Sequence, residues 1–216
     1  MNTDKISHKS RHTKTTLYVA RVAAMAAMLT AFKFALSFIP NVEVVTLLIL
    51  VYGSAMGIAY ALPATLIFCS IEVAIYGAGS WVLLYFIYWP LLAFLSSLLL
   101  RGRRLWLAII LGVLGSVLFG VLSACCDTLF CVTNLAPAQI GKYWVAYYLR
   151  GLYFDLSHVI SSAVTVSVLY VPLVGVLKKI APVGTEIGKR GMRRHQWEEY
   201  ERELPFVTDD DGAENF

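Results

Sequence analysis

Charged residues are scarce in this chain, and their scarcity excludes an ordinary soluble domain. Only 15% of the 216 residues are Asp, Glu, Lys or Arg, and 58% are hydrophobic. A typical soluble domain carries about 25% charged residues. Apolar runs of about 18 residues or more recur along residues 1–180, and each is long enough to cross a bilayer. The composition therefore predicts an all-α membrane protein with a single helical bundle.

Several catalytic and metal-binding patterns are also missing. The serine in "GVLGSVLFG" lacks the glycine that follows the nucleophile of a rhomboid-like protease, and no glycine-rich phosphate loop is found. No internal repeat or cleavable signal peptide is evident. We expect no catalytic residue, metal or cofactor. The four cysteines, Cys69, Cys125, Cys126 and Cys131, lack the spacing of metal ligands. Either they fill apolar space, or Cys131 forms a disulfide with Cys125 or Cys126.

Apolar periodicity and its interruptions predict a bundle of six transmembrane helices. The polar segment 125–145 is predicted to be a long loop that holds at most a short interfacial helix. The last span exceeds one membrane thickness, so it either tilts or projects from the bilayer. The predicted spans are 16–38, 44–59, 61–77, 81–100, 105–125 and 146–178, with the second and third separated only by 60–63.

The basic residues predict the orientation of these spans. They gather in the N-terminal tail 1–15, in the turn 101–104 and after the last span, whereas the loops on the other side hold only Lys142. Positive residues stay in the cytoplasm, so both termini are predicted to be cytoplasmic. The net charge of +4 then reflects topology, and nucleic-acid binding is a poor explanation for it. Residues 16–180 form the membrane domain, and 181–216 form a charged tail that we expect to be partly disordered.

The first span has two different faces. Small residues recur on one face at helical spacing, and small residues let another helix approach closely in lipid. This face either packs inside the chain's own bundle or docks a partner. Lys33 lies about 200° around the helix from it, so it either faces the bundle interior or snorkels to the outer interface. The small residues are Ala20, Ala23, Ala24, Ala27 and Ala31.

Polar residues gather near the outer ends of the first three spans. Asn41 favours a turn between two spans, and Glu43 either caps the second span or faces a ligand. Glu72 lies inside the membrane, one helical turn from Tyr76. An intramembrane carboxylate either contacts a ligand or pairs internally, for instance with Lys33.

The fourth span carries four aromatic residues on one helical face: Trp81, Tyr85, Tyr88 and Trp89. Tyr88 and Trp89 lie about 11 to 12 Å deeper than Trp81 by helical rise, too deep for a simple interfacial belt. They form either a stacking wall for a flat ligand or an ordinary bundle core.

The sixth span adds two neighbouring polar faces. Tyr143, Tyr147 and Arg150 share one face, and Asp155 and His158 share the next. Charged groups in lipid are costly, so these residues are predicted to face the interior, in an internal network or against a ligand. The outer halves of the spans then form a semi-polar, aromatic-lined cavity typical of a small-molecule site. Lys33 and Arg150 would suit an anionic group on the ligand.

The stretches "FIPNVEVVTLLILVYG" and "YGAGSWVLLYFIYWP", with the alanine stripe and cytoplasmic termini, resemble the substrate-binding S component of energy-coupling factor (ECF) transporters. The resemblance covers about residues 16–180. It implies a protein of a prokaryotic plasma membrane that captures a vitamin or related micronutrient on the outer face. It also implies docking, through the five alanines, to a transmembrane coupling subunit with two cytoplasmic ATPases. The implied pocket comprises Asn41, Glu43, Tyr76, Trp81, Tyr85, Tyr88, Trp89, Tyr143, Tyr147 and Arg150.

Two features keep another class open. The tail beyond about 180 is longer than the resemblance leads us to expect, and it is both basic and acidic. A non-transport membrane scaffold or a small intramembrane enzyme, with this tail as its working part, is therefore the alternative to an S component.

Overall fold

The architecture is helical throughout the part of the chain that the computed structural model describes, which is residues 3–39, 44–100 and 104–180. Five of its helices are long and apolar enough to cross a membrane, so the all-α prediction is confirmed and the helices are compatible with a multi-pass membrane protein. The elements are α1 (Thr3–Ala35), α2 (Val45–Met56), α3 (Ile58–Tyr76), α4 (Ser80–Leu99), α5 (Leu105–Cys131), the 3₁₀ turn η1 (Val132–Asn134) and α6 (Pro137–Ile180).

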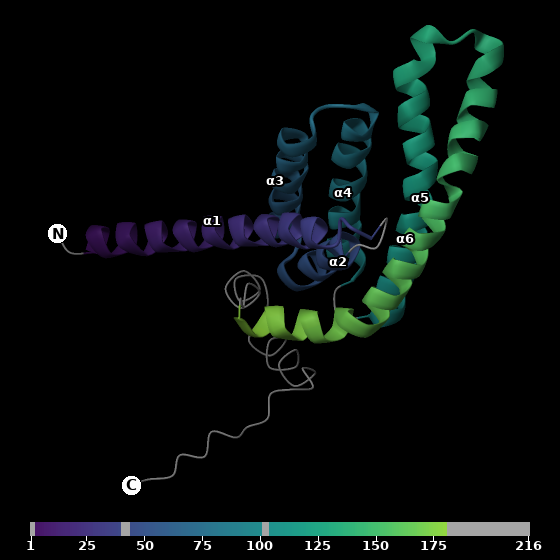
Figure 1. Ribbon diagram of the computed structural model, residues 1–216. Coiled ribbons are helices and arrows are strands. Elements are labelled where there is room, and N and C mark those ends of the chain that lie inside the picture. Colours follow the sequence, from purple (N-terminus) through teal and green to yellow (C-terminus); the bar gives the residue numbers. More distant parts are fainter. Residues whose placement is uncertain (1–2, 40–43, 101–103, 181–216) are drawn as a thin grey trace.

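The short helix α2 is the centre of the fold. It contacts each of the other α-helices, and Figure 1 shows it between α1 and α6. Nearly all of its residues are buried. Its 12 residues give a length of about 18 Å, well short of the roughly 30 Å hydrocarbon core of a bilayer. A helix that is apolar all round is stable when other helices surround it. The helix at the predicted second span is thus enclosed by the other helices, and it is shorter than its predicted range 44–59.

The break between α2 and α3 lies at Gly57, before the predicted break at 60–63. Gly57 has φ 78°, in the left-handed region that glycine enters without steric cost. Pro63 lies inside α3, where it cannot donate a hydrogen bond to the carbonyl of Ala59. The Tyr18 hydroxyl donates to that carbonyl instead, at 2.9 Å. A side chain of α1 therefore satisfies the backbone group that the proline leaves open.

The predicted loop at 125–145 is wrong, because α5 continues to Cys131 and α6 begins at Pro137. The polar residues that suggested a loop have partners at the helix ends. Asp127 accepts hydrogen bonds from Ser80 Oγ and Tyr143 Oη, both at 2.6 Å. Gln139 Oε1 accepts from the N–H of Ala136 at 3.1 Å, at the start of α6. The four cysteines are free thiols, which agrees with the non-disulfide alternative.

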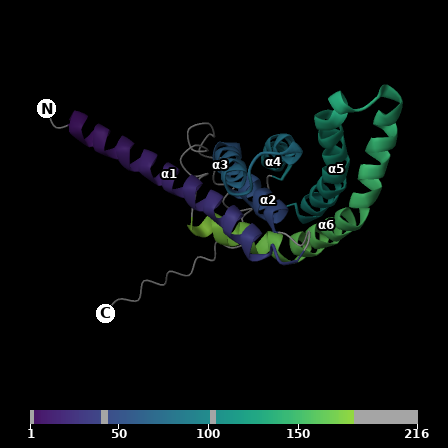
Figure 2. The ribbon, with the colours of Figure 1, turned by 45° about the horizontal axis from the view of Figure 1, so that its top comes forward.

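Helices α5 and α6 form a long antiparallel pair on one side of the molecule, and α1 lies on the other (Figures 1 and 2). Small residues on α5 let the pair approach closely, as in many membrane helix contacts. A Cβ on Gly112 would touch Val166, and Ser116 Oγ donates to Ser162 Oγ at 2.8 Å. The serine of "GVLGSVLFG" is therefore a packing residue. The 44-residue α6, about 66 Å long, bends so that its C-terminal part runs beneath α2 in Figure 1.

Helices α2 and α4 also meet backbone to backbone. Gly53 faces Ser96 so closely that an added Cβ would overlap the serine side chain and lie 2.9 Å from the backbone nitrogen of Ser97. Ser54 Oγ donates to the carbonyl of Leu100 at 2.9 Å, which ties the same two helices at their ends. Close approach therefore depends on the missing side chain at Gly53.

The substitution Gly53→Ala is expected to push α2 away from α4 and lower the thermal midpoint of the protein in detergent. Overpacking of this kind costs about 1–3 kcal/mol. The matched control is Gly141→Ala on α6, where an added Cβ meets nothing within 4 Å. Circular dichroism melting should show a clear drop for the first variant and none for the control. Equal midpoints for both variants would contradict the close packing of α2 on α4.

Candidate functional site

The inward face of α1 places Lys33 against α3 and α4. Lys33 follows the buried residues Val22, Ala26 and Leu29 at spacings of four, three and four, so all four side chains share one helical face. The five alanines Ala20, Ala23, Ala24, Ala27 and Ala31 are exposed. We name these five residues the alanine face. The expected opposition between Lys33 and the alanine face is therefore present.

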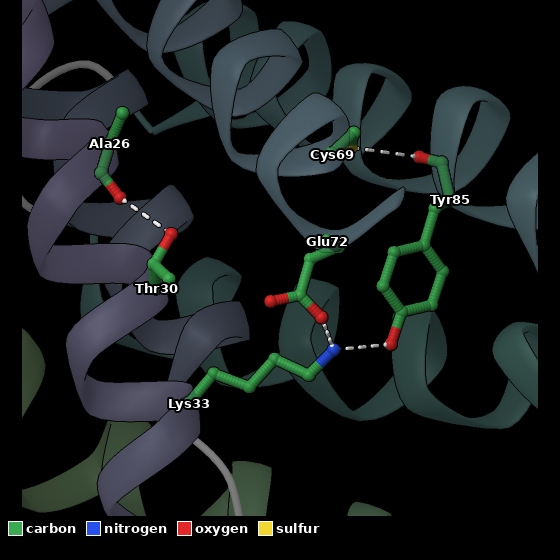
Figure 3. Close-up of polar contacts among 6 residues, drawn as sticks. All are labelled: Ala26, Thr30, Lys33, Cys69, Glu72 and Tyr85. Carbon is green, nitrogen blue, oxygen red and sulfur yellow. Dashed lines mark hydrogen bonds and ion pairs between the residues drawn. The ribbon is translucent and has the colours of Figure 1, made fainter. Parts of the chain in front are cut away.

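The ammonium of Lys33 is held by a carboxylate and three aromatic rings. Lys33 Nζ forms an ion pair with Glu72 and donates a hydrogen bond to Tyr85 Oη at 2.9 Å (Figure 3). The same nitrogen lies 4.7 Å from the ring centroid of Tyr85, 5.7 Å from that of Phe68 and 5.6 Å from that of Tyr76. We name these five residues the Lys33 cluster. Of the alternatives for Lys33 and Glu72, the structure contains the internal pair.

Burial makes the pair energetically important. The Glu72 side chain is 2% exposed and that of Lys33 is 25% exposed. Each desolvated cation–π contact contributes about 0.5–2 kcal/mol, whereas removing one partner of a buried ion pair costs about 3–5 kcal/mol. The larger penalty falls on a separated pair, because the buried Glu72 carboxyl would then lie among apolar groups without its partner. The Lys33 cluster therefore fixes how α1 lies on α3 and α4.

The aromatic residues of α4 continue from the Lys33 cluster into the core. Tyr85 contacts Trp81 and Trp89 edge to face, with ring centroids 5.1 and 5.8 Å apart. Trp89 in turn lies 4.7 Å from Tyr88, and both of these rings are buried. Phe119 of α5 packs 5.0 Å from Tyr88. The deep pair Tyr88 and Trp89 thus occupies the bundle core, while Trp81 and Tyr85 remain partly exposed.

His158 belongs to the same interior. Its ring lies 5.3 Å from that of Phe119, edge to face. Its Nε2 lies 3.5 Å from Thr46 Oγ1 on α2, and the residue is 4% exposed. His158 therefore faces the centre of the bundle, behind the ring of Phe119.

A separate cleft of about 310 Å³ lies between α5 and α6. This volume is at the lower end of the range for small-molecule sites, about 300–1,000 Å³. Three of the predicted site residues line it, together with small and aromatic residues that were not among the predicted site residues. We name it the α5–α6 cleft; its lining is Phe119, Gly120, Ser123, Tyr147, Tyr148, Arg150, Gly151, Phe154 and Asp155.

The α5–α6 cleft carries one charge of each sign. Arg150 is exposed, and its Nε donates weakly to the carbonyl of Ala146 at 3.4 Å. Asp155 is half-buried against Gly120, where an added Cβ would overlap the carboxylate. Within the described part of the chain these two residues form no ion pair with each other. The guanidinium and the carboxylate therefore do not neutralise each other across the cleft.

The remaining predicted residues lie apart from the α5–α6 cleft or outside the described residues. Tyr143 donates to Asp127 at the far end of the α5–α6 pair, and its hydroxyl also lies 3.4 Å from Cys131 Sγ. Asn41 and Glu43 fall in 40–43, outside the described residues. The expected single cavity is thus divided into the Lys33 cluster and the α5–α6 cleft, with Phe119 packed between them.

Comparisons with protein-family models, with curated proteins and with solved structures found no match. A functional assignment therefore depends on the residues described above and their chemistry.

A double-mutant cycle tests the ion pair of the Lys33 cluster. Lys33→Met keeps the volume of the side chain but leaves the buried Glu72 without its cation, so we expect a loss of about 3–5 kcal/mol. Adding Glu72→Leu removes the uncompensated charge and should recover most of that stability. Thermal or denaturant unfolding of the four proteins in detergent measures the coupling. Simple additivity of the two single effects would contradict a direct pair.

Proposed function

We propose that this chain is the membrane-embedded, substrate-capturing S component of an ECF-type importer in a prokaryotic plasma membrane. In this proposal all six helices cross the membrane, with α2 the shortest, and the basic residues hold both termini in the cytoplasm. The observation that carries the proposal is the α5–α6 cleft, which is lined by aromatic side chains, a guanidinium and a carboxylate. The cleft lies in a chain with five membrane-length helices.

The lining of the α5–α6 cleft favours a small, partly polar aromatic ligand. Tyr147, Tyr148 and Phe154 offer ring surfaces, while Arg150 and Asp155 offer one donor group and one acceptor group. Mostly apolar walls with a few placed polar groups are the general form of small-molecule sites. A vitamin or related micronutrient with a flat ring and an anionic group matches these features. Arg150 alone is assigned to the anion, because Lys33 is already paired with Glu72.

The alanine face supports docking to a membrane partner. Its five alanines are exposed on α1, opposite the face that α1 buries against α3. In lipid there is little hydrophobic drive for helix association, so small residues that permit close contact become important. The partner in this proposal is the transmembrane coupling subunit, with its two cytoplasmic ATPases. ATP hydrolysis is assigned to those ATPases, because this sequence has no glycine-rich phosphate loop.

The ligand-capture proposal predicts that the purified full-length chain binds a vitamin-like molecule. Native mass spectrometry should find a co-purified ligand, or titration with a panel of vitamins and their precursors should give saturable binding. Arg150→Gln should weaken binding by about tenfold or more, since a hydrogen bond to a charged group contributes about 1.5–3 kcal/mol. Lys142→Gln, an exposed charge outside the lining of the cleft, is the control and should not change it. No binding to any panel member, with no rescue of vitamin auxotrophs, would overturn the proposal.

The docking proposal predicts that the double substitution Ala24→Leu, Ala27→Leu abolishes transport but leaves ligand binding in detergent intact. Bulky side chains on the alanine face would keep the coupling subunit at a distance. Uptake of labelled ligand by cells and co-purification with the coupling subunit measure the effect. Ala74→Leu, which changes an exposed alanine on α3, is the control. An intact complex in the double variant would refute docking through the alanine face.

A further inference from the structure

The Lys33 cluster has the composition of a recognition site for organic ammonium ions. Three aromatic rings lie 4.7 to 5.7 Å from the Lys33 nitrogen. A carboxylate contacts the same nitrogen directly (Figure 3). Aromatic rings attract cations through their negative faces, and sets of such rings bind alkylammonium ligands in other proteins. In this chain the ammonium at the centre belongs to the protein itself.

The charge of the cluster points to a cationic ligand. Glu72 is buried, and within the described residues its ion-pair partner is Lys33. If Lys33 moved out, the remaining rings and carboxylate would carry a formal charge of −1. An anion would be repelled from that position. An ammonium ion would restore the ion pair with Glu72 and the contacts with the three rings that Lys33 had made. The sequence led us to expect that Lys33 contacts an anionic group of a ligand. The charge of the cluster favours a cationic ligand instead.

The position of Lys33 allows the exchange. Its side chain is 25% exposed, and Tyr76, one wall of the cluster, is 55% exposed. Lys33 is also only two residues from the end of α1 at Ala35. A long lysine side chain at a helix end can extend its amine to the polar interface while its methylene groups stay in apolar surroundings. Lys33 could therefore leave the cluster without α1 unfolding.

We propose that the Lys33 cluster is a second ligand site, which binds the alkylammonium group of an organic cation, and that Lys33 occupies it until the ligand displaces the lysine. The site lies on α1, α3 and α4, and none of its residues lines the α5–α6 cleft. The proposal does not depend on the importer function, since the binding concerns the isolated chain.

Chemical rescue of Lys33→Ala tests whether the cluster accepts an external ammonium. The substitution removes the amine and most of its stem, which leaves space for n-butylammonium. We expect n-butylammonium chloride to raise the thermal midpoint of this variant in a saturable way, because a ligand that binds only the folded state stabilises it. The uncharged 1-butanol, at the same concentration and ionic strength, should not. The double variant Lys33→Ala, Glu72→Gln should lose the rescue, because the carboxylate is gone.

Titration of the wild-type protein tests the displacement of Lys33, and it remains informative if Lys33→Ala does not fold. Tryptophan fluorescence should change saturably with n-butylammonium, since the Trp81 ring lies 5.1 Å from that of Tyr85. Glu72→Gln should abolish this change. Affinity in folded Lys33→Ala should exceed that of the wild type by about tenfold or more, because the tethered competitor is absent. Equal responses to n-butylammonium and 1-butanol, or a wild-type response that Glu72→Gln retains, would overturn the proposal.

Discussion

The ion pair between Lys33 and Glu72 is the contact on which the arrangement of this protein depends. It joins α1 to α3, and the hydrogen bond from Lys33 to Tyr85 extends the contact to α4. A buried ion pair adds little net stability compared with apolar packing, but its separation is costly. Its main effect is therefore on register and rotation. With Lys33 turned inward, the helical repeat turns the alanine face outward, so one interaction determines both surfaces of α1.

The other half of the molecule is held mainly by close packing of small residues. Ser116 of α5 meets Ser162 of α6, and Gly120 accommodates Asp155, so that α5 and α6 lie side by side. Gly120 and Asp155 also line the α5–α6 cleft, which opens there between the two helices and includes Arg150 and the neighbouring aromatic residues. Phe119 contacts Tyr85 on one side and lines the cleft on the other, which places the two candidate sites within one connected aromatic core.

Much of this arrangement could be predicted from the sequence, because hydrophobic length and helical periodicity are local properties. The membrane-length helices and the opposite directions of Lys33 and Ala31 follow from them directly. The role of α2 does not, since an apolar run has the same composition in lipid as in a protein core. The sequence also does not predict that α5 and α6 extend into 125–145, because the polar residue Asp127 suggests a loop there. Its hydrogen-bond partners Ser80 and Tyr143 lie on other helices, and they cannot be identified from the local sequence. Likewise, helical periodicity identifies Arg150 and Glu72 as residues that face the bundle interior. It does not show which helix lies opposite each residue. The sequence therefore predicts one cavity where the structure has two separate sites.

Nuclear magnetic resonance of the full-length chain in lipid nanodiscs tests the central claim most directly. With ¹⁵N-labelled lysine and ¹³C-labelled glutamate, a through-space signal between a lysine Nζ and a glutamate Cδ reports direct contact of the two groups. If Lys33 and Glu72 are paired inside the membrane, the wild-type spectrum contains the signal of this pair. That signal is then absent from both Lys33→Met and Glu72→Leu. A wild-type spectrum in which no signal is lost on either substitution would contradict the pair and with it the rotation assigned to α1.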